Sequence, residues 1–279
     1  MKLILSRKGF DSAAGGCPSA LLDGRPVSFP IPTRQPSPTG YGDLTKDLAT
    51  LITDLTRGRI TADHRCHLDP DLEAAALPRL AGWRGALGQV STAQTHLANN
   101  LIAPGDLFLF WGLFRAASRS GGGGRWQFTG HAEHRIFGWL QIDEILTVGE
   151  DPTPALTRHP WLASHPHLAT GWNKNNTVYV ARNEHTLPGV RAGLPGFGLF
   201  RIGVRLTAAT SPQPSTWTVP AWLNPRTGGT GLTYHPLERW STDGDNRLRA
   251  AARGQEFIAD LGHRADARDW LAQLFSSET

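Results

Sequence analysis

Short apolar runs alternate with segments of helical periodicity along this chain of 279 residues. Leucine and isoleucine recur at helical spacing over 43–56, which predicts an amphipathic helix capped by Asp43. A more polar helix is expected over 91–100, and helices at 247–261 and 265–275 are expected to end the chain. Apolar runs bounded by glycine, proline and aspartate predict strands at 1–5, 27–31, 105–112, 135–146, 176–181, 198–206 and 215–219.

The middle of the chain resembles the PUA-like barrels, among them the ASCH and EVE domains. Residues 104–108 read proline, glycine, aspartate, leucine and phenylalanine, and a later strand carries isoleucine, phenylalanine and glycine at 136–138 before an acidic turn. This resemblance implies an α+β protein with a mixed or antiparallel β-barrel over roughly 100–220. Because no repeat and no long linker divides the chain, a single domain over 1–279 is expected, with helices from both ends packed on the barrel.

Composition narrows the class of protein. Hydrophobic residues make up 39% and charged residues 19%, as in globular proteins. The sequence has no run of about 18 apolar residues, so no membrane span is predicted. Cys17 and Cys66 lie in unlike contexts and predict no disulfide framework, which favours a cytoplasmic protein. A net charge of +4 and a pI near 9.4 favour a polyanionic partner, but the cations are too scattered for a broad duplex-binding surface.

The strand expected at 1–5 runs directly into a polar cluster. Its members are Ser6, Arg7, Lys8 and Asp11. Arginine forks onto phosphate oxygens and lysine adds a point charge, so the cluster is a candidate phosphate-binding site. A solvated turn is the alternative interpretation. Arg115, which follows the apolar run at 105–112, is a second candidate phosphate contact.

Four segments together resemble the nucleotide modification associated domain 3 family, and the resemblance covers nearly the whole chain. They are 6–12, 27–32, 66–71 and 253–257. The resemblance implies a role in nucleotide or DNA modification, with a nucleotide, nucleoside or nucleic-acid base as ligand and modifying enzymes as partners. Because the family name records an association and not a reaction, the mechanism has to be argued from side chains.

The densest acid–base stretch is 63–71, in which Asp69 and Asp71 are candidate catalytic groups. His67 and Asp69 have the His-x-Asp spacing of two ligands in a non-haem iron site, so iron or zinc is a candidate cofactor. A third ligand would have to come from a distant histidine. Alternatively, Asp69 caps a helix, since a proline and an alanine-rich stretch follow it. The loop 159–172, with its His-Pro-His sequence, is a candidate lid or mobile segment.

The helix expected over 91–100 carries a second polar group. His96 and Asn99 share one face, where they could orient a water molecule or hydrogen-bond a base edge, and Gln94 lies on another face as a further candidate substrate contact. His96 is therefore a candidate catalytic residue. A solvated helix face would explain the same three residues.

The helix expected over 247–261 carries a third group. Glu256 is followed by apolar residues, so it is expected near the barrel as an acid or base. Arg249 or Arg253, one turn earlier, is expected to keep Glu256 ionised, and Arg253 is also a candidate phosphate contact. A surface ion pair is the alternative interpretation of these residues.

Together these groups predict an enzyme that modifies a nucleotide or nucleoside, with phosphate held by the N-terminal cations and acid–base or metal chemistry from the aspartate–histidine group. The alternative is a non-catalytic PUA-like reader that binds a modified base in a tryptophan-lined pocket. The chain has 10 tryptophans, and Trp111 and Trp139 are the stacking candidates for such a reader. A purely structural partner is the third hypothesis.

Overall fold

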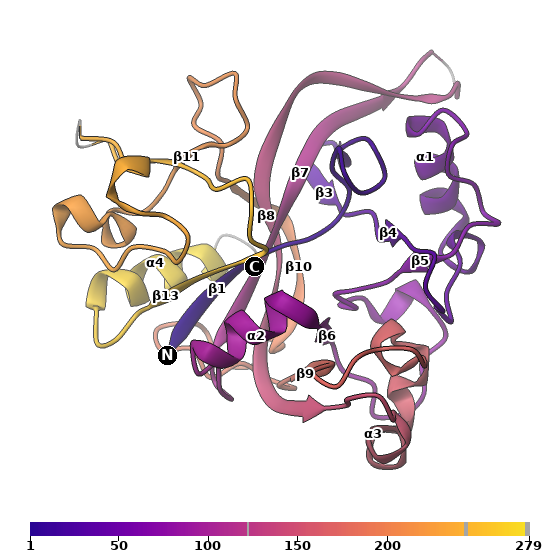
Figure 1. Cartoon of the computed structure of the whole chain (residues 1–279). Coiled ribbons are helices and arrows are strands. Elements are labelled where there is room, and N and C mark those ends of the chain that lie inside the picture. The colour runs from indigo at the N-terminus through magenta and orange to yellow at the C-terminus, as the bar shows by residue number, and fades with distance from the viewer. Residues whose placement is uncertain (122, 243–244, 277–279) are drawn as a thin grey trace.

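The protein is built on one large mixed sheet, seen in a computed structural model that describes residues 1–121, 123–242 and 245–276 (Figure 1). Among these residues the sheet is nine-stranded. Its main path runs in the order β13 (Glu256–Asp260), β1 (Lys2–Arg7), β7 (Leu107–Arg119), β8 (Trp126–Thr147), β9 (Thr177–Ala181) and β6 (Ala86–Gln89). Off this path are β10 (Phe197–Arg205), which pairs with β8, and β2 (Ser19–Leu22), which pairs with β7 and β3 (Arg25–Val27).

The central position of β1 explains the apolar start of the chain. β1 pairs in parallel with β7 and antiparallel with β13, so it has a neighbour on each edge. Leu3 and Leu5 belong to a core on one face of the sheet, whereas Ile4 belongs to the core on the other face. This alternation follows from the two-residue period of a strand, and all three side chains are buried.

Helices and small sheets cover the central sheet on both sides. In Figure 1, α1 (Lys46–Leu55) lies on one side of the long β7–β8 hairpin and α4 (Ala265–Ser276) lies on the other. The remaining α-helices of the described chain are α2 (Ser91–Asn99) and α3 (Thr153–Arg158). Two-stranded sheets join β4 (Ile31–Pro32) to β5 (Cys66–His67) and β11 (Thr216–Thr218) to β12 (Arg247–Arg249). The 3-10 helices are η1 (Tyr41–Asp43), η2 (Ala74–Ala76), η3 (Pro160–Ser164), η4 (Pro166–Leu168), η5 (Ala221–Leu223), η6 (Pro225–Thr227) and η7 (Leu237–Arg239).

The expected closed β-barrel is wrong, although the mixed α/β class is confirmed. Among the described residues, β13 pairs with β1 and β6 pairs with β9, so the two ends of the strand order do not meet. β8 instead changes partners along its 22 residues, pairing with β7 and β10 and then, near its end, with β9. The sheet therefore branches. The short motifs that suggested a barrel specify two local strands. Whether the sheet closes into a barrel depends on whether its two edge strands pair with each other.

The expected helix over 247–261 is also wrong, because this segment forms β12 and β13. Gly254 has φ +91°, a left-handed conformation that interrupts any helix there. The apolar residues after it complete the central sheet beside β1. The helices expected over 91–100 and 265–275 are confirmed as α2 and α4.

The helix expected over 43–56 begins later, at Lys46, as α1. Asp43 lies in η1 instead, where its carboxylate accepts the Gly40 N–H at 2.7 Å. No helix in the described part of the chain is long and apolar enough to span a bilayer.

Candidate functional site

The candidate site lies where the end of β1 meets two distant acidic residues. Lys8 follows β1, and its Nζ lies 3.7 Å from Asp69 Oδ2 and 3.9 Å from Glu256 Oε1. The side chains of Lys8, Asp69 and Glu256 are 10%, 3% and 1% exposed. β13 brings Glu256 opposite Ser6 of β1, and the loop after β5 brings Asp69. Three ionisable groups that are far apart in the sequence therefore share one buried region.

Glu256 is held at one oxygen and left free at the other. Its Oε1 accepts hydrogen bonds from Ser6 Oγ at 3.0 Å and from Gln89 Nε2. Its Oε2 is buried without a hydrogen-bond partner. Burial raises the pKa of Glu256 to about 7, although the charge of Lys8 favours the ionised form. A carboxyl group with such a pKa can donate or accept a proton near neutral pH.

Asp69 is the ionised member of the cluster. Its Oδ1 accepts the Gly88 N–H at 2.7 Å, and His165 Nε2 lies 3.3 Å from the same oxygen. Burial opposes ionisation, but the charge of Lys8 and the contact with His165 outweigh it and hold the pKa of Asp69 well below its ordinary value. The expected role of Asp69 as a helix cap is not realised, since only the short η2 follows it.

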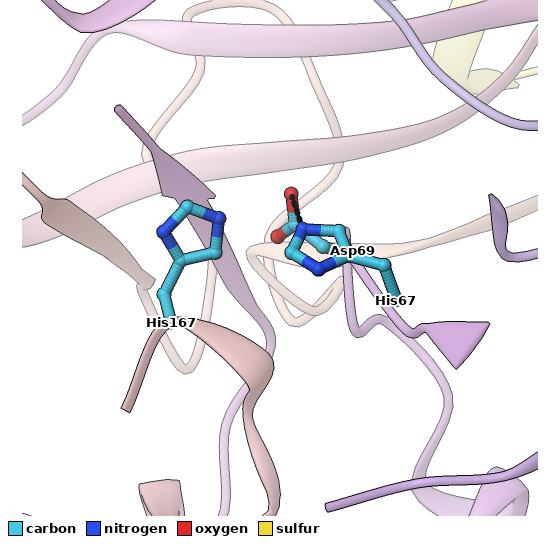
Figure 2. A group of neighbouring side chains, drawn as sticks. All are labelled: His67, Asp69 and His167. Atoms are coloured by element: carbon cyan, nitrogen blue, oxygen red, sulfur yellow. Dashed lines mark ion pairs between the residues drawn. The ribbon is translucent and has the colours of Figure 1, made fainter. Parts of the chain in front are cut away.

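Two histidines complete a compact group with Asp69. His67 comes from β5 and His167 from η4, and one ligand atom from each of the three residues lies within 4.8 Å of the others. Figure 2 shows the His67 ring beside the Asp69 carboxylate, with the His167 ring facing them from the other side. Burial lowers the pKa of His67 to about 4 and that of His167 to about 3, so both rings are neutral at pH 7.

An open cavity of about 420 Å³ lies on the Glu256 side of the cluster. Its walls are Gln89, His96, Tyr234, the turn at 254–256 and the first residues of α2. Tyr234 is 45% exposed, and the centre of its ring lies 4.6 Å from that of His96. His96 Nε2 lies 3.2 Å from Thr233 Oγ1. The first N–H groups of α2 lack partners within the helix, as at any helix N-terminus.

The N-terminal cations separate in the structure. Lys8 points into the cluster, whereas the Arg7 guanidinium reaches the Ala252 carbonyl at 3.4 Å, beside the turn that borders the cavity. Arg253 is exposed in that same turn. Asp11 closes a local turn by accepting the N–H groups of Ala13 and Ala14, and it does not join the cluster.

Other predicted site residues lie apart from the cluster. Arg115 donates to the Gly130 carbonyl at 2.9 Å and lines a separate hollow with Arg57 and Arg125. The Asp71 carboxylate accepts hydrogen bonds from both terminal nitrogens of Arg79, at 2.6 and 2.7 Å. This fork satisfies a buried carboxylate and anchors its loop.

Helix α2 also divides its predicted residues. Gln94 accepts the Tyr179 hydroxyl at 2.9 Å and is buried, whereas Asn99 is exposed. Of this group, only His96 faces the cavity beside Glu256.

Several residues of the site were not predicted from the sequence. His165 and His167 were noted only as part of a candidate lid, and the His-Pro-His sequence was their one signal. Gly88 and Gln89 gave no signal, because their positions depend on the pairing of β6 with β9. Glu256 was predicted, but Lys8 is its charged partner in place of Arg253.

Comparison with known proteins gives one match. The family model described as nucleotide modification associated domain 3 matches residues 2–260. No curated protein and no solved structure gives a significant match. The matched range contains every residue of the Lys8–Asp69–Glu256 cluster and both histidines beside Asp69, and it ends before α4.

Proposed function

Because the chain belongs to the nucleotide modification associated domain 3 family, we propose that it is an enzyme that modifies a nucleotide or nucleoside. In this proposal the substrate occupies the cavity of about 420 Å³ beside α2, and Glu256 is the general acid or base. Lys8 and Asp69 set the electrostatic environment of Glu256.

The observation that carries the proposal is the unpartnered Oε2 of Glu256, buried in the cluster and belonging to a residue that lines the cavity. Burying an ionisable group that is not fully paired costs several kcal/mol of folding free energy. This cost is on the order of the total stability of a marginally stable protein. A purely structural carboxylate is expected to have both oxygens satisfied. A carboxyl group that has one oxygen without a hydrogen-bond partner and a pKa near neutrality is typical of a group that exchanges a proton with a substrate.

The walls of the cavity suit the parts of a nucleotide. Tyr234 offers an exposed aromatic face on which a base can stack. The N-terminus of α2 lines the cavity and offers a positive dipole end, which favours a phosphate. Arg253, which is exposed and precedes Gly254 of the cavity wall, adds positive charge. In this proposal the bound substrate exchanges a proton with the carboxyl group of Glu256, which lines the cavity.

The tryptophans do not favour the alternative function of a base reader. Trp111 is 1% exposed and Trp139 is 9% exposed, and both belong to the core packed against α4. Neither presents a free face to a base. The aromatic surface beside the cavity comes from Tyr234 instead, next to a group suited to proton transfer.

The test compares wild-type protein with Glu256→Gln on pools of nucleotides, nucleosides and oligonucleotides, followed by mass spectrometry. We expect a mass change with wild type and a loss of about 10²–10⁴ in rate for the variant, as for removal of a general acid or base. Binding measured by calorimetry should stay within about threefold, because the amide keeps the shape of the side chain.

The matched control is Glu238→Gln, which alters an exposed glutamate of η7 and should react like wild type. Full turnover by Glu256→Gln would contradict the proposal. Tight nucleotide binding by wild type without any change of mass would identify the chain as a reader.

A further inference from the structure

We propose that His67, Asp69 and His167 form a binding site for one divalent transition-metal ion of the zinc or ferrous iron class. The inference deepens the proposed function, because the site shares Asp69 with the cluster around Glu256. It rests on other residues, however, and metal binding is measured independently of turnover.

The donor set and its spacing fit such an ion. Two imidazole nitrogens and one carboxylate oxygen are the ligands of many catalytic zinc and non-haem iron sites, which keep further positions for water or substrate. His67 Nε2 lies 3.8 Å from Asp69 Oδ2, and the whole set spans 4.8 Å. Ligands about 2.1 Å from one tetrahedral ion lie roughly 3.4 Å apart. A small side-chain rotation therefore brings the three groups to coordination distance.

Asn176 determines which nitrogen of His167 is available. The Nδ2 of Asn176 donates to the His167 carbonyl at 2.8 Å and to the Gly149 carbonyl at 3.4 Å, so its Oδ1 faces the imidazole. This oxygen lies 2.6 Å from His167 Nδ1. An amide oxygen only accepts, hence Nδ1 carries the proton and Nε2 presents a lone pair. Metal-binding histidines are commonly oriented by such a partner.

Packing holds the His167 ring in place. Trp172 stacks on it at 4.4 Å with an interplanar angle of 5°. On the β6 side the ring approaches Gly88 so closely that a Cβ there would lie 2.1 Å from His167 Cδ2. The ring thus packs between the Trp172 indole and the backbone of β6, where only glycine at position 88 leaves enough space. The same Gly88 donates its N–H to Asp69 Oδ1, whereas Oδ2 faces His67.

Lys8 is the one cation that competes for Asp69 Oδ2 among the described residues. Its Nζ lies 3.7 Å from this oxygen, beyond hydrogen-bond distance, and it also faces Glu256 at 3.9 Å. Lys8 therefore makes no hydrogen bond to Oδ2. Removing the lysine charge with Lys8→Met should strengthen metal binding, since one repulsive charge beside the ion is lost.

The experiment uses untagged protein, treated with chelator, desalted and titrated with Co²⁺ under visible absorption. Zn²⁺ affinity is then measured by competition with a chromophoric chelator. We expect about one equivalent of metal, with Co²⁺ bands in the range of nitrogen and oxygen ligands. His67→Ala and His167→Ala should weaken affinity at least about 100-fold, and Asn176→Leu about 10–100-fold, as for loss of a partner that orients a ligand. His131→Ala, an exposed histidine on β8, should bind like wild type.

Failure of wild type to bind Co²⁺, Zn²⁺ or anaerobic Fe²⁺ would overturn the site, as would unchanged affinity in both histidine variants. Because Asp69 is buried in an ion cluster and its variant can fail to fold, the histidine variants carry the test, with circular dichroism to verify folding. Glu256→Gln separates the two proposals. If wild type and Glu256→Gln bind the ion equally and neither alters a nucleotide, the metal site is supported and the proposed function is overturned.

Discussion

At the scale of single residues, the site contrasts two buried carboxylates in different environments. Asp69 accepts a backbone N–H, lies near Lys8 and His165, and is ionised. Glu256 shares the lysine but has one oxygen without a partner, and its pKa is raised to about 7. Carboxyl groups whose pKa values are pushed apart in one site can take different roles in one reaction. Glu256 is thereby suited to move a proton and Asp69 to remain charged.

The raised pKa of Glu256 predicts a pH-dependent stability. Its ordinary value is 4.5, so between about pH 4.5 and 7 the folded protein keeps a proton that the unfolded chain loses. The contribution of Glu256 to the free energy of unfolding is therefore complete at low pH and is lost as pH rises through 7. The total loss is at most about 3 kcal/mol. Glutamine mimics the protonated form and carries no such dependence.

Urea unfolding at pH 5 and pH 8 measures this effect. We expect Glu256→Gln to gain up to about 3 kcal/mol relative to wild type between these two pH values. Asp69 is present in both proteins and cancels in the comparison. Glu238→Gln should follow wild type at both pH values, and parallel pH curves for wild type and Glu256→Gln would contradict the assignment.

At the scale of elements, the segment between β5 and β6 delivers Asp69 to the site. Asp71 pairs through its backbone with Ala86 at the start of β6, and its carboxylate receives the fork of Arg79. The Asp71 side chain is 3% exposed, so this ion pair is buried. We therefore propose that Asp71, which the sequence suggested as a candidate catalytic group, anchors the loop that carries Asp69.

Arg79→Ala is predicted to destabilise the protein by about 3–5 kcal/mol, because it leaves the buried Asp71 carboxylate without its partner. Arg84→Ala is the matched control, since Arg84 pairs with Asp143, which is 39% exposed. This control should cost less than about 1 kcal/mol. Denaturant unfolding of both variants gives the comparison, and equal losses would contradict a buried, anchoring pair.

At the scale of the whole molecule, the site draws on distant parts of the chain. Lys8, Asp69, His167 and Glu256 meet because β1 lies inside the sheet, with β13 on one edge and β7 on the other. The family match ends at residue 260, yet α4 beyond it buries Ala267, Leu271, Leu274 and Phe275 in the core. We therefore propose that the chain folds as one unit that includes α4.

Phe275→Ala tests this proposal. The Phe275 ring lies 5.4 Å from Trp139 and 5.5 Å from Phe200, and the side chain is 2% exposed. Its loss should cost about 3–5 kcal/mol of unfolding free energy and alter the fluorescence of Trp139. Leu237→Ala, at a 54% exposed position, should stay within about 0.5 kcal/mol of wild type. A loss below about 1 kcal/mol for Phe275→Ala would place α4 outside the cooperative unit.

The sequence by itself determined those features that depend on neighbouring positions. Strand β1, the core of β7 and helices α2 and α4 follow from periodicities of two or about 3.6 residues, which act within one element. The family was also recognisable, since its motifs are short segments spread along the chain. Lys8, His67, Asp69 and Glu256 were candidates because charged and metal-binding side chains stand out beside apolar runs.

Only the tertiary structure decided how these parts combine. The segment 256–260 is a strand because β1 offers it a free edge, and the sheet stays open because β13 and β6 pair with different partners. Asp69 meets His167 and Lys8, which lie far from it in the sequence. Backbone pairing and charge–charge contacts act between residues that are adjacent only after folding. No local pattern therefore encodes them.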